Sequence, residues 1–261
     1  MLNEVKLLLK HGKQYIPDIQ REKLPNISRG RPIIEKGIGE KTANFLINLC
    51  PTQAIQNKPF RIDLGKCLFC NECALALPEK IKFTNDYKLA TNDTRNLIIK
   101  EGEDKRILFN EKLIRNEIKN IFGKSLKLRQ ISAGGDNSCE LELNACGNVN
   151  FDMGRFGIEF TASPRHADGI VITGPITENM AEAIKICYEA VPAPKIVVLF
   201  GVDAISGGIF SGSKSLNREF IENVSIDLYI PGNPPHPLTF INGILELIRN
   251  KNHTFRLNKQ K

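Results

Sequence analysis

The stretch GIVITGPITENMAEAIKICYEAVPAPKIVVLF, residues 169–200, has an apolar run at each end and a helical pattern between them. Both runs are rich in Ile, Val and Leu, which favours buried strands. The intervening helix has Thr177 as a good N-cap and Glu178 in its first turn, and Pro192 ends it. A strand, a helix and a strand with short connections predict a parallel pair joined by a right-handed crossover.

The same alternation continues on both sides of this stretch. We therefore predict an α/β domain with a parallel sheet over residues 129–250, closed by a last helix over Leu238–Arg249. Upstream we expect a helix over Glu4–His11, a strand-like run LIIK and an amphipathic helix over Asn110–Phe122. The predicted strands of the sheet are Leu126–Ile131, Ile158–Thr161, Gly169–Thr173, Ile196–Phe200 and Ile226–Ile230.

The composition is that of an ordinary globular chain. Its 261 residues are 41% hydrophobic and 25% charged, which sets aside disorder and fibrous repeats. The net charge of +7 is a mild surplus that suits an acidic partner, a membrane surface or simple solubility. We see neither a secretory signal nor a bilayer-spanning run, so we expect a cytoplasmic protein with reduced thiols.

Seven cysteines are present, and four of them form a recognisable set. Cys67, Cys70 and Cys73 lie in GKCLFCNECALALP, and Cys50 stands upstream in the sequence LCPTQAI. Three thiolates at this spacing wrap one corner of a cubane cluster, and a remote cysteine followed by proline supplies the fourth ligand. The pattern predicts one 4Fe–4S cluster on these four residues.

This segment resembles a bacterial ferredoxin in which one of two clusters has been lost. Counting back from Cys50 at the ferredoxin spacing, the first triplet of ligands would fall at Glu40, Ala43 and Leu46. The fourth ligand of that set would fall at Leu77, before Pro78. None of these residues can supply a thiolate, so all ligands of one cluster are missing while all ligands of the other are present.

Two alternatives to the cluster remain open at this stage. A four-cysteine zinc site is one, although structural zinc sites favour two CxxC pairs on separate knuckles. Buried thiols without any ligand are the other. Counting iron, sulfide and zinc in the purified protein separates these possibilities.

Four motifs in the second half carry a family resemblance. They resemble the small electron-transfer subunit of membrane-bound, energy-converting nickel–iron hydrogenases of the formate hydrogenlyase type, which is related to the complex I subunit carrying the last cluster before quinone. The similarity covers about residues 123–250, and RGRPII resembles the start of the ferredoxin-like module found fused to some members. The motifs are DNSCELELNA (136–145), RFGIEFTASPRHADGIVITGPIT (155–177), GVDAISGGIF (201–210) and YIPGNPPHP (229–237).

The resemblance implies a flavodoxin-like domain with a cubane held by four cysteines at the carboxyl ends of its strands. This chain keeps one of the four, Cys139, and carries Asp136, Asp203 and Asn233 at the other ligand positions. One thiolate, two carboxylates and an amide do not make a cubane site, so we expect the second 4Fe–4S cluster to be absent. The alternatives are a hard metal ion or, as we favour, polar side chains that bind loop amides.

Other residues have weaker claims to a role. The resemblance suggests that Arg165 and His166 face a large partner subunit, although local salt bridges explain the loop arginine equally well. His236 is expected to be a loop residue, because no second ligand stands at metal spacing. Cys146 and Cys187 are expected to be small core fillers.

We therefore predict a chain without a catalytic site of its own, an iron–sulfur electron-transfer subunit of a membrane-associated hydrogenase-like or complex I-like oxidoreductase. The alternative is a divergent structural or assembly subunit of such a complex. The expected partners are protein subunits rather than nucleic acid, with membrane contact through those partners. The predicted segments are an N-terminal helix and extended arm (1–35), a small α+β ferredoxin-like domain (36–90), a connecting strand and helix (91–128), a flavodoxin-like α/β domain (129–250) and a basic tail (251–261).

Overall fold

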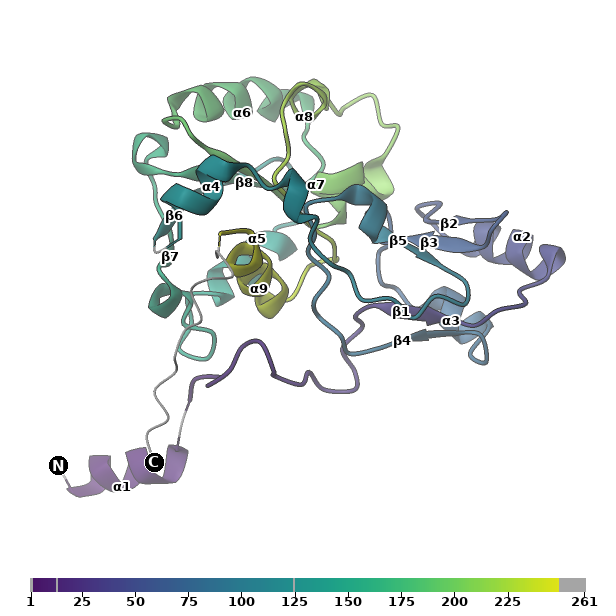
Figure 1. The fold of residues 1–261 in the computed structure, drawn as a ribbon, viewed down its shortest axis with the longest axis horizontal. Coiled ribbons are helices and arrows are strands. Elements are labelled where there is room, and N and C mark those ends of the chain that lie inside the picture. The colour runs from purple at the N-terminus through teal and green to yellow at the C-terminus, as the bar shows by residue number, and fades with distance from the viewer. Residues whose placement is uncertain (1, 13, 124, 249–261) are drawn as a thin grey trace.

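The computed structural model describes residues 2–12, 14–123 and 125–248, and Figure 1 shows their arrangement. The second half of the chain forms a five-stranded sheet in which every pairing is parallel, in the order β7-β6-β8-β9-β10. Numbered from its own first strand, this order is 2-1-3-4-5, the flavodoxin-like order. The predicted parallel α/β sheet is thus confirmed. Its strands are β6 (Leu126–Ser132), β7 (Ile158–Phe160), β8 (Gly169–Thr173), β9 (Ile196–Phe200) and β10 (Leu228–Ile230).

Helices cover both faces of this sheet. On one face lie α6 (Glu178–Ala190) and α8 (Glu219–Asn223), and on the other lie α5 (Ser138–Ala145) and α9 (Pro237–Ile248) (Figure 1). Every residue of β8 and β9 is buried, as expected for strands covered on both faces. The predicted end of the last helix at Arg249 lies outside the described residues.

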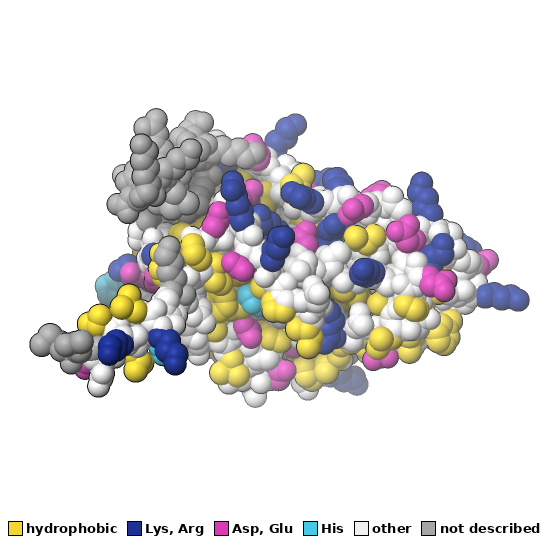
Figure 2. All heavy atoms as spheres, turned by 90° about the horizontal axis from the view of Figure 1, so that it is seen from below, with side chains coloured by type: hydrophobic (Ala, Val, Ile, Leu, Met, Phe, Trp, Pro, Cys, Tyr) yellow, Lys and Arg dark blue, Asp and Glu magenta, His cyan; other side chains and the backbone are white. Residues whose placement is uncertain are grey.

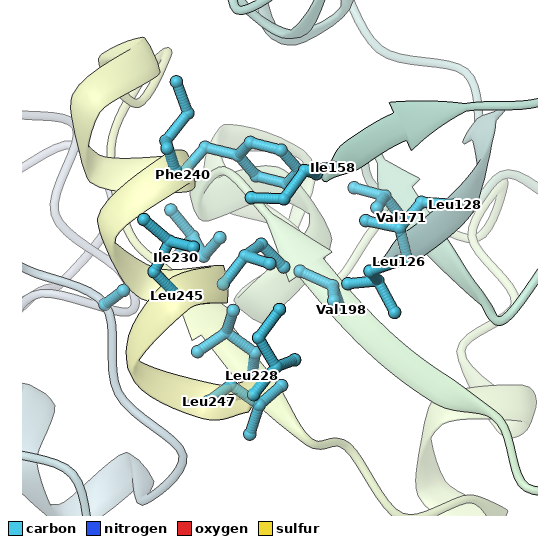
Figure 3. Packing of buried hydrophobic residues seen from close by; sticks show 14 of the residues in the cluster. Leu126, Leu128, Ile158, Val171, Val198, Leu228, Ile230, Phe240, Leu245 and Leu247 are labelled. Atoms are coloured by element: carbon cyan, nitrogen blue, oxygen red, sulfur yellow. The ribbon is translucent and has the colours of Figure 1, made fainter. Parts of the chain in front are cut away.

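The face under α9 holds the larger core of the sheet domain. Phe240 projects from α9 and is fully buried, with its ring 5.6 Å from that of Phe200 and 5.9 Å from that of Phe160. Leu245 and Leu247 of the same helix extend this packing toward the strands (Figure 3). The helix α9 and the sheet are therefore joined by the burial of aliphatic and aromatic side chains, the dominant favourable contribution to folding.

The cysteine-bearing half has two small antiparallel ladders. One is β2-β3-β5 and the other is β1-β4, and two helices accompany them. Their shared core draws on residues from Ile34 to Ile107, across the boundaries predicted at 36 and 90. The ferredoxin-like assignment of this half remains a prediction. The elements are β1 (Pro32–Ile34), α2 (Glu40–Leu49), β2 (Ile55–Gln56), β3 (Arg61–Asp63), α3 (Glu72–Ala76), β4 (Ile81–Phe83), η1 (Thr94–Leu97) and β5 (Ile98–Lys100).

The segment that connects the halves is docked on the sheet domain. Thr91 donates its backbone N–H to Tyr229 O at 3.0 Å, and its carbonyl accepts from Tyr229 N at 2.8 Å, beside the strand β10. Gly243 of α9 leaves the space that the methyl group of Ala90 fills. The two halves are thus held together by hydrogen bonds and close packing.

The predicted helix over Asn110–Phe122 is wrong as one continuous element. The chain forms η2 (Glu111–Leu113) and α4 (Asn116–Ile121), with Arg115 extended between them at φ −60° and ψ 135°. The Arg115 guanidinium donates to both carboxylate oxygens of buried Asp227, each at 3.0 Å. This ion pair, made across 112 residues of sequence, overrides the local helical pattern.

The first helix, α1 (Leu2–His11), begins two residues before the predicted Glu4. It stands away from the body of the protein and carries exposed apolar and basic side chains (Figures 1 and 2). No helix among the described residues is long and apolar enough to cross a membrane. The remaining short helices are η3 (Met153–Phe156), η4 (Pro164–His166), α7 (Val202–Ser206) and η5 (Gly208–Phe210).

Candidate metal centre

The four cysteines predicted to act together line one pocket. Cys50 caps the C-terminal end of α2, Cys67 and Cys70 lie in the loop after β3, and Cys73 is in the first turn of α3. Burial raises the pKa of Cys67 to about 12 and that of Cys73 to about 11. Repulsion from the neighbouring cysteines adds to the rise in both pKa values, which places these sulfurs within electrostatic range of one another.

Backbone amides are directed at two of these sulfurs. Ala54 donates its N–H to the Sγ of Cys50, and Phe69 donates its N–H to the Sγ of Cys67, each at 3.3 Å. Both donors depend on a residue in the left-handed conformation. Ala54 directly follows Gln53 (φ 53°), and Phe69 itself has a φ of 54°. Amide donors of this kind stabilise thiolates and tune the potential of a cluster bound to them.

The donor chemistry of this pocket fits a group held by thiolates. Its candidate ligands are soft sulfur atoms, and Cys67 is buried while Cys70 is exposed. Among the described residues, no group of three or more His, Cys, Asp or Glu side chains has the geometry to hold a single metal ion. Whether a metal or a cluster binds at the four cysteines stays a prediction.

One contact to the loop after β3 that carries Cys67 and Cys70, the cysteine loop, is not predicted from the sequence. The guanidinium of Arg29 donates to the carbonyl oxygen of Phe69 at 2.7 Å, from a position forty residues upstream. The motif RGRPII begins with this arginine, but nothing in the sequence indicates which backbone group it binds.

The residues predicted for the second site lie on loops at the carboxyl ends of the strands. Asp136 follows β6, Cys139 is in the first turn of α5, Asp203 is in α7 after β9, and Asn233 follows β10. The carboxyl ends of parallel strands at a switch in strand order are where such folds bind ligands. The four positions taken from the resemblance therefore lie in the region of the fold where a ligand would be expected.

The loops of the second site are in direct contact. A Cβ built on Gly201 would lie 2.6 Å from the Sγ of Cys139, so only glycine, here at φ +95°, leaves room for that thiol. The next residue, Val202, donates its N–H to the carbonyl of Gly232 at 2.9 Å and joins the loops after β9 and β10. Asn233 itself is exposed at the edge of this cluster of loops.

The second site combines one buried thiol with nearby carboxylates. Burial raises the pKa of Cys139 to about 12, and the nearby carboxylates of Glu140, Asp203 and Asp136 add to the rise. Burial also raises the pKa of Asp203, and repulsion from Asp136 adds to the effect. With one thiol, two carboxylates and one amide, the donor set does not fit a 4Fe–4S cluster, which thiolates hold.

Asp136 instead makes local hydrogen bonds of the expected kind. Its Oδ1 accepts from the backbone N–H of Ser138 at 3.0 Å and from the hydroxyl of Ser138 at 2.6 Å. These bonds lower the pKa of Asp136 below its usual range. The carboxylate thus stabilises the turn that leads into α5.

A cavity of about 370 Å³ lies between the two candidate sites. Cys70 and Arg29 line it from the cysteine-bearing half, while Asn233, His236 and Glu142 line it from the sheet domain. The exposed cysteine of the first site and the last ligand position of the second site therefore open onto one space.

Three predictions about other residues are confirmed and one stays open. His236 is a loop residue whose Nδ1 accepts from Leu238 N at 3.1 Å, and its burial lowers its pKa. Cys146 is fully buried in the core under α9, and Cys187 of α6 packs against the core on the opposite face. Arg165 and His166 are exposed in η4, and their role stays a prediction.

Comparison with known proteins agrees with the sheet domain. Residues 137–247 match the family model described as NADH ubiquinone oxidoreductase, 20 Kd subunit. A probable membrane-bound hydrogenase subunit of Pyrococcus furiosus is 35% identical over 124 residues, which are 48% of this chain and 74% of the relative. An NADH-quinone oxidoreductase subunit of Citrifermentans bemidjiense is 43% identical over 120 residues, which are 45% of this chain and 70% of the relative.

A solved structure of the membrane-bound sulfane sulfur reductase, an archaeal respiratory membrane complex, contains a similar chain. It is 32% identical, with a TM-score of 0.42, over 48% of this chain and 68% of that one. An uncharacterized protein of Methanocaldococcus jannaschii is 38% identical over 131 residues, which are 50% of this chain and 88% of the relative. This chain belongs to the family of the 20 kDa subunit of NADH–ubiquinone oxidoreductase.

Proposed function

We propose that this chain is an electron-transfer subunit of a membrane-associated oxidoreductase of the complex I or hydrogenase type. Relatives matched over most of their own length are named as subunits of a membrane-bound hydrogenase and of NADH-quinone oxidoreductase. The observation that carries the proposal is the pocket lined by Cys50, Cys67, Cys70 and Cys73. These residues would hold one 4Fe–4S cluster in a ferredoxin-like module.

A bound cluster would supply reversible one-electron transfer at this pocket. The chain's own residues prepare the pocket in two ways. The amides of Ala54 and Phe69 donate to the sulfurs of Cys50 and Cys67, the kind of hydrogen bond that tunes a cluster held by those sulfurs. Burial of Cys67 limits water at one side, while the exposure of Cys70 leaves the other side near the surface.

The second site has a different role in this proposal. Asp136, Cys139, Asp203 and Asn233 form a polar pocket without a second cluster. The loops 133–140, 201–210 and 231–237 would then contact a large partner subunit rather than relay electrons. The protein would be peripheral on the cytoplasmic side of the membrane, joined to it through partner subunits.

The test is anaerobic purification followed by counts of iron, acid-labile sulfide and zinc per chain. We expect about four irons and four sulfides, with an EPR signal that appears on reduction and disappears on reoxidation. The variant Cys70→Ala should lose this signal. The matched control Cys187→Ala removes a half-buried thiol on α6 and should keep it.

Other results would overturn parts of the proposal. Zinc without labile sulfide would replace the cluster by a zinc site. About eight irons would show that the second site holds a cluster after all. A cluster that cannot be reduced reversibly would favour the alternative, a structural or assembly subunit, which the altered ligand positions of the second site specifically support.

A further inference from the structure

Arg29 lies in the N-terminal arm just before β1, and its side chain crosses to the cysteine loop. Its guanidinium donates to the carbonyl oxygen of Phe69 at 2.7 Å. This carbonyl belongs to the peptide that joins Phe69 to Cys70. The contact therefore acts on the backbone between two of the predicted ligands, Cys67 and Cys70.

The conformation of Phe69 needs support from its surroundings. Its φ of 54° lies in the left-handed region, which is costly for a bulky side chain. Its ring is buried and lies 5.9 Å from that of Phe83, and its N–H donates to the Sγ of Cys67. Arg29 fixes the remaining polar group, so the residue is held at its ring, its amide and its carbonyl.

The same contact brings a permanent positive charge to the cysteine loop. A guanidinium stays protonated at all physiological pH values. The charged residues within the loop, Lys66 and Glu72, have opposite signs, so Arg29 adds a net positive charge from another segment. A cation near a redox group stabilises the form with the additional electron. Arg29 is exposed and faces the cavity, so solvent weakens this effect.

We propose that Arg29 is a positioning residue that raises the reduction potential of the group bound by the four cysteines. It does so by its charge and by holding the Phe69 carbonyl, which helps to fix the left-handed conformation of Phe69; the N–H of that residue, in the preceding peptide, donates to Cys67. The inference rests on the proposed function, because it assumes a redox cluster on these cysteines.

The experiment compares Arg29→Gln and Arg29→Lys with the wild type by EPR-monitored redox titration, after iron counting. Arg29→Gln should reduce the ratio of reduced to oxidised cluster at the wild-type midpoint by about three- to tenfold, tenfold being about 59 mV for one electron. Arg29→Lys keeps a charge that can donate to the carbonyl and should stay close to the wild type. The control Arg21→Gln removes an exposed arginine of the same arm that pairs with Asp18 instead, and should not shift the midpoint.

The outcomes separate this inference from the proposed function. A wild-type protein without iron and sulfide overturns the proposed function. Full iron in Arg29→Gln with an unchanged midpoint overturns the inference alone, as does an equal shift in Arg29→Lys. Should Arg29→Gln fail to hold iron, the salt dependence of the wild type decides the question. Screening of the exposed guanidinium by about 1 M salt should lower the wild-type midpoint, and a midpoint that does not change with salt overturns the inference.

Discussion

Replacing Gly243 by alanine tests the docking of the connecting segment on α9. A methyl group built at Gly243 would lie 2.5 Å from the Cβ of Ala90, well inside van der Waals contact. Leu228 and Ile230 lie beyond it at 3.6 and 3.9 Å, in ordinary contact. The clash therefore falls on the methyl group of Ala90, which cannot rotate away. Either α9 or the chain around Ala90 must move.

Two opposing contributions set the magnitude. Overpacking of a core typically costs about 1–3 kcal/mol, whereas alanine in a helix interior is favoured over glycine by about 1 kcal/mol. Gly243→Ala alone should therefore lower the free energy of unfolding by up to about 2 kcal/mol. In the Ala90→Gly background the clash is absent, and Gly243→Ala should raise the free energy of unfolding by about 1 kcal/mol.

The assay is urea denaturation of the four proteins of this double-mutant cycle, followed by circular dichroism. We expect an interaction free energy above about 1 kcal/mol, because independent sites add to within about 0.5 kcal/mol. A cycle that is additive within that margin would refute the close contact between α9 and the connecting segment. Unchanged m-values would show that the interaction free energy does not come from a change in the compactness of the unfolded state.

Three further predictions concern the two candidate sites and the core. Changing Asp136, Asp203 and Asn233 together to cysteine should raise the iron content from about four to about eight per chain if the loops keep the geometry of a cluster site; no gain would show that they have lost it. Because burial lowers the pKa of His236 from 6.5, the folded protein binds this proton less tightly, so stability should fall as the pH drops from about 7 to 5. His236→Asn, which keeps an acceptor for the start of α9, should reduce that fall in pH-dependent urea midpoints, and an unaltered profile would contradict it. Phe240→Ala should lower the free energy of unfolding by about 3–5 kcal/mol in urea, since the ring is fully buried, and a loss below about 1 kcal/mol would contradict the packing in Figure 3.

The strands β8 and β9 have the bounds predicted from sequence, because each is an uninterrupted apolar run that both faces of a sheet can bury. The helix α6 between them begins after Thr177 as predicted, although the threonine side chain makes no capping hydrogen bond. The local sequence pattern is sufficient to predict an element where burial and secondary-structure propensity agree.

Local pattern fails where a distant group decides the backbone. Arg115 leaves the helical conformation to reach Asp227, and no window around Arg115 contains that carboxylate. Arg29 reaches the cysteine loop in the same way. The cysteine set itself could be predicted from spacing, whereas its amide donors depend on left-handed turns at Gln53 and Phe69, residue types that rarely adopt such a conformation.

The pairing of Thr91 with Tyr229 has a consequence for assembly. It occupies part of the outer backbone of β10, the last strand of the sheet, and the opposite outer strand, β7, is only three residues long. A sheet whose borders are short or already bonded offers little template for strand addition by another chain. Partner subunits would therefore bind side chains and loops rather than extend the sheet, and the same arrangement protects the unassembled chain from edge-to-edge aggregation.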